Sequence, residues 1–155
     1  MLTESETIVR IGLCALLGGA IGFERELSEH HAGFRTHVLV ALGAGLFTLA
    51  GVHAMEAYAD QGARVDPTRI AAQVVTGIGF LGAGTILRQG ATVRGLTTAA
   101  SLWVTAAIGT AVGLGFLSGG IATTIAALIA LVVLRWIESH VFRRADGDEG
   151  DPDRL

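Results

Sequence analysis

The feature that most constrains this chain is a long stretch without charge. From residue 95 to residue 134 the sequence contains no Asp, Glu, Lys or Arg. This stretch of about forty residues is twice the roughly 20 that cross the hydrocarbon core of a bilayer as a helix. Ser118, Gly119 and Gly120 lie near its midpoint, where the chain is expected to turn back. The stretch therefore predicts two membrane helices joined by a very short connection.

The rest of the chain has the same character. Hydrophobic residues make up 51% of it and charged residues only 16%, below the roughly 25% that is usual in soluble domains. Apolar runs predict five spans, at 7–23, 36–55, 67–87, 97–116 and 120–139. We therefore expect an all-α, polytopic membrane protein with about five transmembrane helices. Residues 1–140 would form the transmembrane domain, and residues 141–155 a disordered, charged cytoplasmic tail.

The arginines predict the orientation of these helices, because cytoplasmic loops of membrane proteins are enriched in Lys and Arg. If the N-terminus is outside, the cytoplasmic side receives eight of the eleven basic residues: Arg25, Arg35, Arg88, Arg94, Arg135, Arg143, Arg144 and Arg154. The outer side receives Arg10, Arg64 and Arg69. The prediction is an outside N-terminus and a cytoplasmic C-terminus. The net charge of −3 gives no indication of nucleic-acid binding.

Glycines are abundant, and some lie in a pattern that resembles a cofactor motif. Residues 77–82 match G-x-G-x-x-G, but dinucleotide binding also needs a preceding strand and an acidic residue about twenty positions on. No Asp or Glu occurs between Asp66 and Glu138. We therefore expect no cofactor, and close helix packing at small residues instead. The glycines predicted to serve it are Gly18, Gly22, Gly77, Gly79, Gly82, Gly84, Gly109 and Gly113.

One face of the fourth span carries small and hydroxyl residues at every fourth position, namely Thr97, Ser101, Thr105, Gly109 and Gly113. This stripe favours contact with another helix, and a wetted substrate path is the alternative. In the third span Gln73 is expected to pair with another helix.

The most distinctive polar cluster follows the first span. It contains Glu24-Arg25-Glu26, then Glu29-His30-His31, then Arg35-Thr36-His37. Three interpretations stay open. The cluster can be a solvated connector with salt bridges. It can be an interfacial charge network of Glu24, Arg25 and Arg35 that holds two helices in register or senses a partner. It can also bind a divalent metal through Glu26, Glu29, His30 and His31.

Asp66 precedes Pro67, a typical helix start, so it is expected to cap the third span, and a metal-ligand role is compatible with that. Thr36 and Thr97 are expected to cap the second and fourth spans. The candidate metal carboxylates are thus Glu24, Glu26 and Asp66. The sequence offers neither an intramembrane carboxylate pair nor a nucleophile beside a base. We therefore expect no enzyme and no catalytic residue.

Four ordered blocks of the sequence resemble the MgtC/SapB family of bacterial inner-membrane proteins: GGAIGFERE at 18–26, AGFRTHVLVALGAGLF at 32–47, DPTRIAAQVVTGIGFLGAGTIL at 66–87 and RGLTTAASLWVTAAIG at 94–109. The resemblance implies about five membrane helices and an outside N-terminus. It also implies a link to growth at low magnesium and, in pathogens, to virulence. Longer members add a cytoplasmic C-terminal domain, and this chain resembles a short form without it.

The family blocks also imply which polar residues matter for function. They are Glu24, Arg25, Glu26, Arg35, Thr36, His37, Asp66, Pro67, Arg69, Gln73, Arg94, Gly95, Thr97 and Thr98.

Two functions compete. The first is a non-enzymatic regulator that binds another membrane protein, or a second copy of itself, within the bilayer. The second is a Mg²⁺ transporter or channel. Mg²⁺ demands near-octahedral oxygen ligands, usually including carboxylates, and the candidate acids are predicted at opposite edges of the membrane. The sequence therefore favours the regulator, with Mg²⁺ as a ligand or only as a signal.

Overall fold

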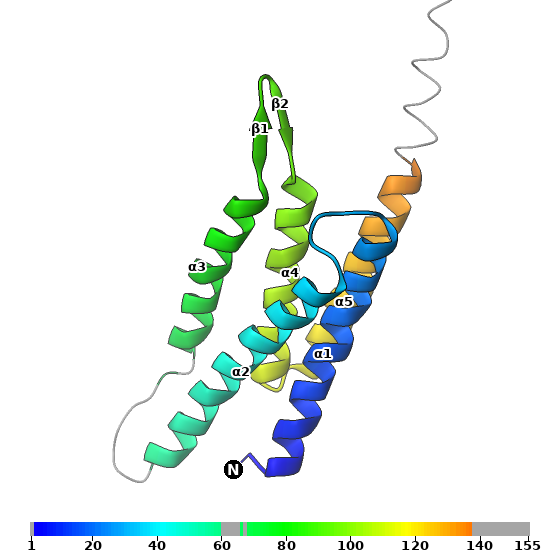
Figure 1. Cartoon of the computed structure of the whole chain (residues 1–155). Coiled ribbons are helices and arrows are strands. Elements are labelled where there is room, and N and C mark those ends of the chain that lie inside the picture. Colours follow the sequence, from blue (N-terminus) through cyan, green and yellow to red (C-terminus); the bar gives the residue numbers. More distant parts are fainter. Residues whose placement is uncertain (1, 60–65, 67, 138–155) are drawn as a thin grey trace, which may run out of the picture.

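The described part of this chain is a bundle of five helices. The computed structural model describes residues 2–59, 66 and 68–137. The order of elements is α1 (Glu4–Leu27), α2 (Phe34–Tyr58), α3 (Thr68–Thr85), β1 (Leu87–Gln89), β2 (Thr92–Arg94), α4 (Leu96–Gly113) and α5 (Leu117–Ile129), which continues as the π-helical turn η2 (Ala130–Leu134). The predicted all-α fold class is confirmed (Figure 1). The predicted tail at 141–155 lies outside the described residues.

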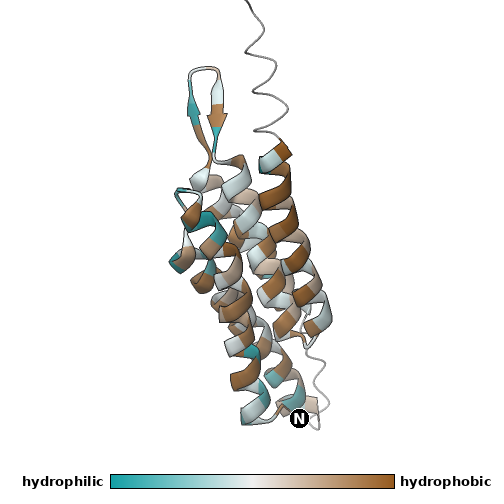
Figure 2. Ribbon diagram, turned by 90° about the vertical axis from the view of Figure 1, so that its right-hand side faces the viewer, coloured by the Kyte–Doolittle hydropathy of each residue, from teal (hydrophilic) through white to brown (hydrophobic). Residues whose placement is uncertain are grey.

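Four of these helices are long and apolar enough to cross a membrane, namely α1, α2, α4 and the continuous helix Leu117–Ile137. Large apolar side chains point outward from the bundle: Leu16 is 68% exposed and Phe80 82% exposed. Figure 2 shows apolar residues along the helices and polar residues concentrated near their ends. This arrangement suits a surface that faces lipid, so the chain is a multi-pass membrane protein. α3 forms where the third span was predicted, but it is not among the four.

The helices alternate in direction, so that connections gather at two ends (Figure 1). We call one the arginine-rich end. It holds the α1–α2 connection, the β1–β2 hairpin and the last turns of the α5 helix, with Arg25, Arg35, Arg88, Arg94 and Arg135. The opposite end holds the N-terminus, the end of α2, the start of α3 and the α4–α5 turn.

The α4–α5 turn lies earlier in the chain than predicted. It is formed by residues 114–116, and Gly115 has the left-handed φ of 88° that glycine adopts without strain. Ser118, Gly119 and Gly120 belong to the first turn of α5, so the prediction of a turn at these residues was wrong. The Arg10 Nη1 donates to the Gly113 carbonyl at 3.0 Å and so joins α1 to this turn.

A β-hairpin between α3 and α4 was not predicted. Strands β1 and β2 pair in antiparallel register, with Leu87 opposite Arg94 and Gln89 opposite Thr92. Only Gly90 and Ala91 connect them, and the φ of Gly90 is 62°. A positive φ at the first of two turn residues suits the right-handed twist of a hairpin, and glycine tolerates it best.

The core of the bundle is built around α4, which contacts each of the other four helices. Buried apolar residues form two clusters, one including Cys14, Ile21 and Val112, the other including Ala44, Ile78 and Leu102. Few large side chains separate α1, α2 and α4, since glycines lie at their contacts. Close backbone approach therefore replaces a bulky core, as expected in lipid.

Candidate functional site

The buried centre of the arginine-rich end is an ion pair on α1. The Arg25 Nε donates to the Glu24 Oε2 at 2.5 Å, and the exposed fractions of the two side chains are only 2% and 11%. The Ser28 hydroxyl donates to the Glu24 Oε1 at 2.9 Å. A buried charge is tolerated only when it is paired and hydrogen-bonded. Glu24 is therefore the counter-charge that allows Arg25 to lie inside the bundle.

A second arginine extends this pair to another helix. Arg135, just after η2, has its Nη2 3.4 Å from the Glu24 Oε1, and its Nη1 donates to the Ser28 hydroxyl. Glu24 thus links the end of α1 to the end of the α5 helix. The predicted charge network exists around Glu24 and Arg25, but its third member is Arg135. Arg35 is exposed at the surface.

His37 forms the neighbouring contact, between α2 and α4. Its side chain is fully buried, with Nδ1 2.9 Å from the Gly33 carbonyl and Nε2 3.1 Å from the Ser101 hydroxyl. A carbonyl can only accept, so Nδ1 carries a proton. In a neutral ring Nε2 then accepts, and the Ser101 hydroxyl must donate to it. The same hydroxyl lies 2.8 Å from the Thr98 carbonyl, so Ser101 has two competing acceptors.

Glu26 has a local structural partner. Its Oε2 accepts from the Phe34 amide at 2.9 Å, which closes the α1–α2 connection onto the start of α2. The predicted caps at Thr36 and Thr97 are not present: the N-cap residues of α2 and α4 are Gly33 and Gly95, which have no side chain to cap the helix. Thr36 and Thr97 lie inside the first helical turns and are exposed.

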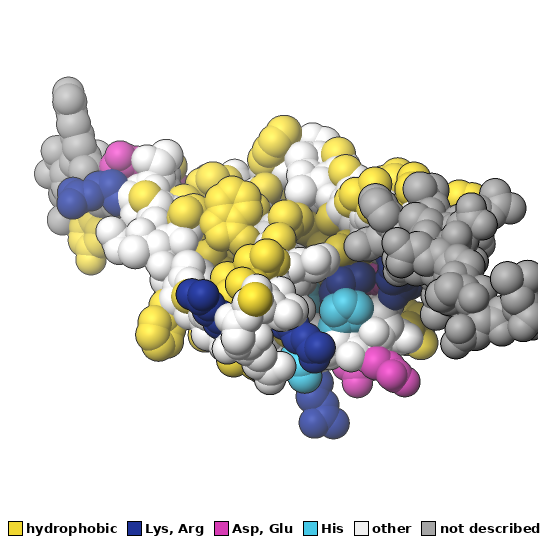
Figure 3. Space-filling model, turned by 90° about the horizontal axis from the view of Figure 1, so that it is seen from above, with side chains coloured by type: hydrophobic (Ala, Val, Ile, Leu, Met, Phe, Trp, Pro, Cys, Tyr) yellow, Lys and Arg dark blue, Asp and Glu magenta, His cyan; other side chains and the backbone are white. Residues whose placement is uncertain are grey.

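Arginine and histidine side chains gather on the arginine-rich end, which Figure 3 views from above. Arg35, Arg88 and Arg94 are exposed there. Arg94 belongs to β2, opposite Leu87, so the hairpin carries two arginines beyond the helices. This end therefore presents exposed arginines, together with the exposed acids Glu26 and Glu29, above the buried Glu24–Arg25 pair.

Asp66, Arg69 and Gln73 lie at the start of α3, toward the opposite end of the bundle (Figure 1). The Asp66 Oδ1 accepts from the Thr68 amide at 2.9 Å and from the Thr68 hydroxyl at 2.6 Å. These hydrogen bonds hold the pKa of Asp66 below its ordinary value. Asp66 thus has the geometry of the predicted helix cap.

The three candidate metal carboxylates are not brought together. Glu24 and Glu26 lie at the arginine-rich end, and Asp66 lies at the start of α3. Within residues 2–59, 66 and 68–137, no three His, Cys, Asp or Glu side chains are grouped as metal ligands would be.

The eight predicted packing glycines fall into two groups. A Cβ at Gly18 would lie 2.6 Å from the Ala41 Cβ, and one at Gly22 would lie 2.8 Å from the Phe34 Cα. Gly113 approaches the Gly45 carbonyl, and Gly109 approaches the Ala41 carbonyl even more closely. These four lie at contacts of α1 and α4 with α2.

The glycines of the G-x-G-x-x-G motif on α3 lie mostly in the open. Gly82 faces Ala99 of α4 at an ordinary distance of 3.7 Å. A Cβ at Gly77, Gly79 or Gly84 would meet nothing within 4 Å. These three glycines therefore contact no other helix within the described part of this chain. That they pack against a helix of another molecule stays a prediction.

Ser28, Ser101 and Arg135 are parts of the site that sequence reasoning did not select as site residues. Ser28 lies four residues after Glu24 on the same helix, a spacing at which side chains meet. Arg135 lies 107 residues from Ser28, and nothing local indicates that contact.

Comparison with known proteins gives one consistent result. The sequence model of the MgtC family matches residues 11–140. The chain is 45% identical over 141 residues to YhiD of Escherichia coli, whose name describes a proposed magnesium transporter, and the match covers 90% of this chain and 66% of YhiD. It is 44% identical over 144 residues to the protein MgtC of Salmonella typhimurium, with 93% of this chain and 59% of that protein covered.

The protein MgtC of Salmonella typhi is 48% identical over 128 residues, with 83% of this chain and 52% of that protein covered. The chain therefore spans between half and two thirds of the length of these relatives. No solved structure matches it.

Proposed function

Because this chain belongs to the MgtC family, we propose that it is a non-enzymatic regulatory protein of the bacterial inner membrane. It acts by binding another membrane protein, or a second copy of itself, and it is linked to magnesium homeostasis. The family membership supports the membrane location and the link to magnesium. The choice between regulation and transport depends on the carboxylates.

The observation that carries the regulatory role is that each candidate carboxylate already has donors within the chain. Glu24 accepts from Arg25 and Ser28, Glu26 from the Phe34 amide, and Asp66 from Thr68. Mg²⁺ sheds its water reluctantly and would have to displace these donors to gain the acidic oxygens. A Mg²⁺ carrier would also need its ligands along one path, and these acids lie toward different ends of the bundle.

The outer face of α3 supports binding to another membrane protein. Ala72, Thr76, Gly79, Phe80 and Ala83 recur at helical spacing and are all exposed. Four of them are small, which lets a second helix approach closely. Phe80, 82% exposed, adds a large apolar side chain to this face.

A Mg²⁺ transporter or channel is the second candidate. The name of YhiD favours it, and a hydrated ion can cross an oligomeric pore lined by hydroxyls and carbonyls. Such a pore would form only between copies of the chain.

Magnesium flux into liposomes that contain only the purified full chain separates the two functions. We expect no flux above that of protein-free liposomes. Flux that is abolished by Asp66→Asn, and unaffected by the exposed-residue control Glu29→Gln, would overturn the regulatory role. A complex recovered from bacterial membranes in mild detergent, lost in Gly79→Leu but kept in Gly12→Leu, would support it. A Cβ meets nothing within 4 Å at either glycine, so both variants are expected to fold.

A further inference from the structure

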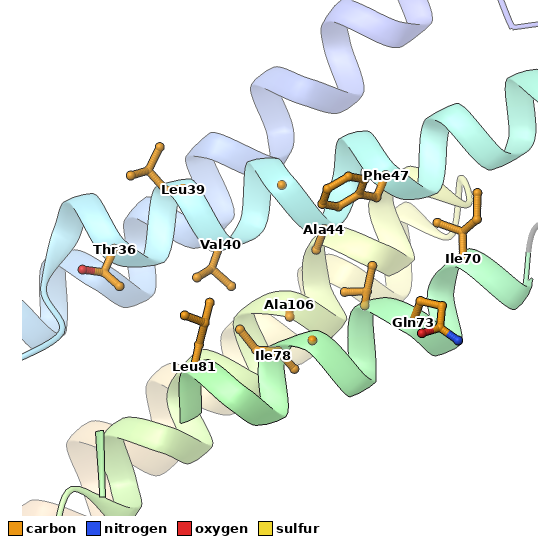
Figure 4. Close-up of a pocket in the computed structure, with 13 residues that line it drawn as sticks. Thr36, Leu39, Val40, Ala44, Phe47, Ile70, Gln73, Ile78, Leu81 and Ala106 are labelled. Carbon is orange, nitrogen blue, oxygen red and sulfur yellow. The ribbon is translucent and has the colours of Figure 1, made fainter. Parts of the chain in front are cut away.

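A long groove runs between α2 and α3, with α4 as its floor. Its main part has a volume of about 720 Å³ and is lined by apolar residues that include Val40, Phe47 and Ile78. A second cavity of about 320 Å³ lies at the arginine-rich end. Thr36, Val40 and Leu81 line both cavities, so the two form one α2–α3 groove. In Figure 4, Val40 and Leu81 point toward one another across it.

The dimensions of the α2–α3 groove match one leaflet of a bilayer. Along α2 it extends from Thr36 to Phe47 (Figure 4), which corresponds to roughly 16 Å at 1.5 Å per helical residue. Half of the hydrocarbon core of a bilayer is about 15 Å thick. The volume also lies in the range of cavities that bind small molecules. An acyl chain that enters from the arginine-rich end would therefore fill the groove to about the middle of the membrane.

The end of the groove at Thr36 favours a negative charge. The starts of α2 and α4 reach this end. The first amide of α2, that of Phe34, is bound to Glu26, whereas the N-cap residue of α4 provides no side-chain hydrogen bond. In α4 the first intrahelical amide bond is that of Ala99 to the Gly95 carbonyl, so the amides of residues 96–98 have no intrahelical acceptor. Such amides and the helix dipole attract phosphate groups.

Thr98 supplies an independent indication of a ligand. It lines the smaller cavity and is only 4% exposed. Within the described residues its hydroxyl has no hydrogen-bond partner, whereas those of Thr105 and Thr124 each donate to a carbonyl. Among the described residues the buried side-chain polar atom without a partner is His30 Nδ1, so the cavity reaches the Thr98 hydroxyl. A phosphate oxygen in the smaller cavity would satisfy it.

Exposed arginines lie next to residues that line this end. Arg35 adjoins Thr36, and Arg94 lies opposite Leu87, which itself lines the smaller cavity. Arg88 lies on the same hairpin. Glu26, the acid close to the start of α2, is engaged with the Phe34 amide. Basic pockets between membrane helices are typical sites for anionic lipid head groups.

We propose that the α2–α3 groove binds one anionic phospholipid. Its phosphate lies at the start of α4, where it accepts from the Thr98 hydroxyl and faces Arg35 and Arg94. One acyl chain lies along the apolar groove. A soluble anion would use the polar end but leave the apolar part unfilled, so the groove favours a lipid. This inference goes beyond the regulatory role and does not depend on it.

Native mass spectrometry of the full chain in detergent tests the proposal, with phosphatidylglycerol as the anionic probe and phosphatidylcholine as the neutral one. We expect one phosphatidylglycerol per chain, retained at about tenfold lower lipid concentration than phosphatidylcholine. Equal retention of the two lipids would overturn the proposal.

Matched variants test the apolar part and the polar end of the groove separately. Gly43 lines the groove and Gly12 does not, yet a Cβ at either meets nothing within 4 Å. Gly43→Leu is expected to lower the retention of both lipids about tenfold and Gly12→Leu to leave it unchanged. Thr98→Val is expected to lower the preference for phosphatidylglycerol about tenfold, because the variant loses a hydrogen bond to a charged group. Thr124→Val, which removes a buried hydroxyl on α5, should keep the preference.

Inorganic phosphate distinguishes a lipid from a free anion. If millimolar phosphate displaces phosphatidylglycerol from the wild-type chain and binds Gly43→Leu as well as wild type, the occupant is a soluble anion. The lipid proposal would then be wrong. Equal effects of Gly43→Leu and Gly12→Leu would exclude the groove. Each result stands whether or not the chain conducts Mg²⁺.

Discussion

At the scale of single residues, the position of Arg25 creates the strongest constraint in the bundle. Its side chain is 2% exposed, and its contact with Glu24 is the ion pair that balances it. Breaking a buried pair by removing one partner costs about 3–5 kcal/mol, because the other charge stays buried without compensation. Glu24 is therefore expected to matter for stability even if it takes no part in binding a partner.

Glu24→Gln is expected to lower the free energy of unfolding by about 3–5 kcal/mol. The double variant Glu24→Gln, Arg25→Met should recover part of that loss, since it removes the buried charge as well. Unfolding in mixed detergent micelles measures both. The control is Glu29→Gln, an exposed acid at the same end, which should stay within about 0.5 kcal/mol of the wild type. A loss in the control as large as that in Glu24→Gln would contradict this reasoning.

Ser101→Ala tests the contact between His37 and α4. The change leaves the His37 Nε2 without its hydrogen-bond donor in a fully buried position, which is expected to cost about 1–3 kcal/mol. The exposed α5 residue Ser118 provides the matched control, Ser118→Ala, with little expected effect. Thermal unfolding of both variants in the same detergent gives the comparison. Equal melting temperatures for the two would show that the His37–Ser101 hydrogen bond contributes nothing.

At the scale of helices, glycines decide how closely the elements approach. Gly113→Ala would place a Cβ 2.7 Å from the Gly45 carbonyl and 2.7 Å from the Thr48 Cβ. Such overpacking between α4 and α2 is expected to destabilise the fold by about 1–3 kcal/mol. Gly79→Ala on the open face of α3 should instead be neutral or stabilising by up to about 1 kcal/mol, from helix propensity. If the two variants unfold alike, backbone approach at Gly113 does not limit the packing.

Most helices could be predicted from the sequence because the hydropathy of a segment of about 20 residues is enough to indicate a membrane helix. The exact turns could not. The chain turns at Gly115 and not at the Gly119-Gly120 pair. Gly115 ends α4 as a left-handed cap, with the amides of Gly115 and Phe116 donating to carbonyls of the last helical turn, and two nearby glycine positions left the choice between them open. The hairpin was missed although Gly90 occupies the position that a two-residue turn favours. Its strands have three residues each, too few to give an alternating pattern.

For the candidate site, too, local contacts could be predicted from the sequence and contacts between distant segments could not. Contacts within α1, such as Arg25 with Glu24, follow from neighbouring positions in the chain. Contacts between helices, such as His37 with Ser101 and Arg135 with Glu24, depend on how the helices pack against one another. The unpartnered hydroxyl of Thr98 has no sequence signal, because its neighbours come from α2, α3 and the hairpin.

At the scale of the whole molecule, the ends of the bundle predict which residues share a side of the membrane. His31→Cys and Thr92→Cys, both at the arginine-rich end, should react with a membrane-impermeant thiol reagent only after the cell is opened. Leu114→Cys, in the α4–α5 turn, should react in intact cells. A Cys14→Ala background removes the native thiol, which is buried. Labelling of positions 31 and 92 from opposite sides would contradict the arrangement of the helices.

The modest hydropathy of α3 has a consequence for how the chain is made. Four helices are apolar enough to enter the bilayer by composition alone, and α3 is not one of them. Arg69 and Gln73 disfavour its transfer into lipid, and its main contacts are with α4, which the ribosome synthesises afterwards. The short connection through β1 and β2 keeps the two helices together. Insertion by the translocon should therefore release α3 and α4 as a pair, and a nascent chain that stops before α4 should leave α3 outside the membrane.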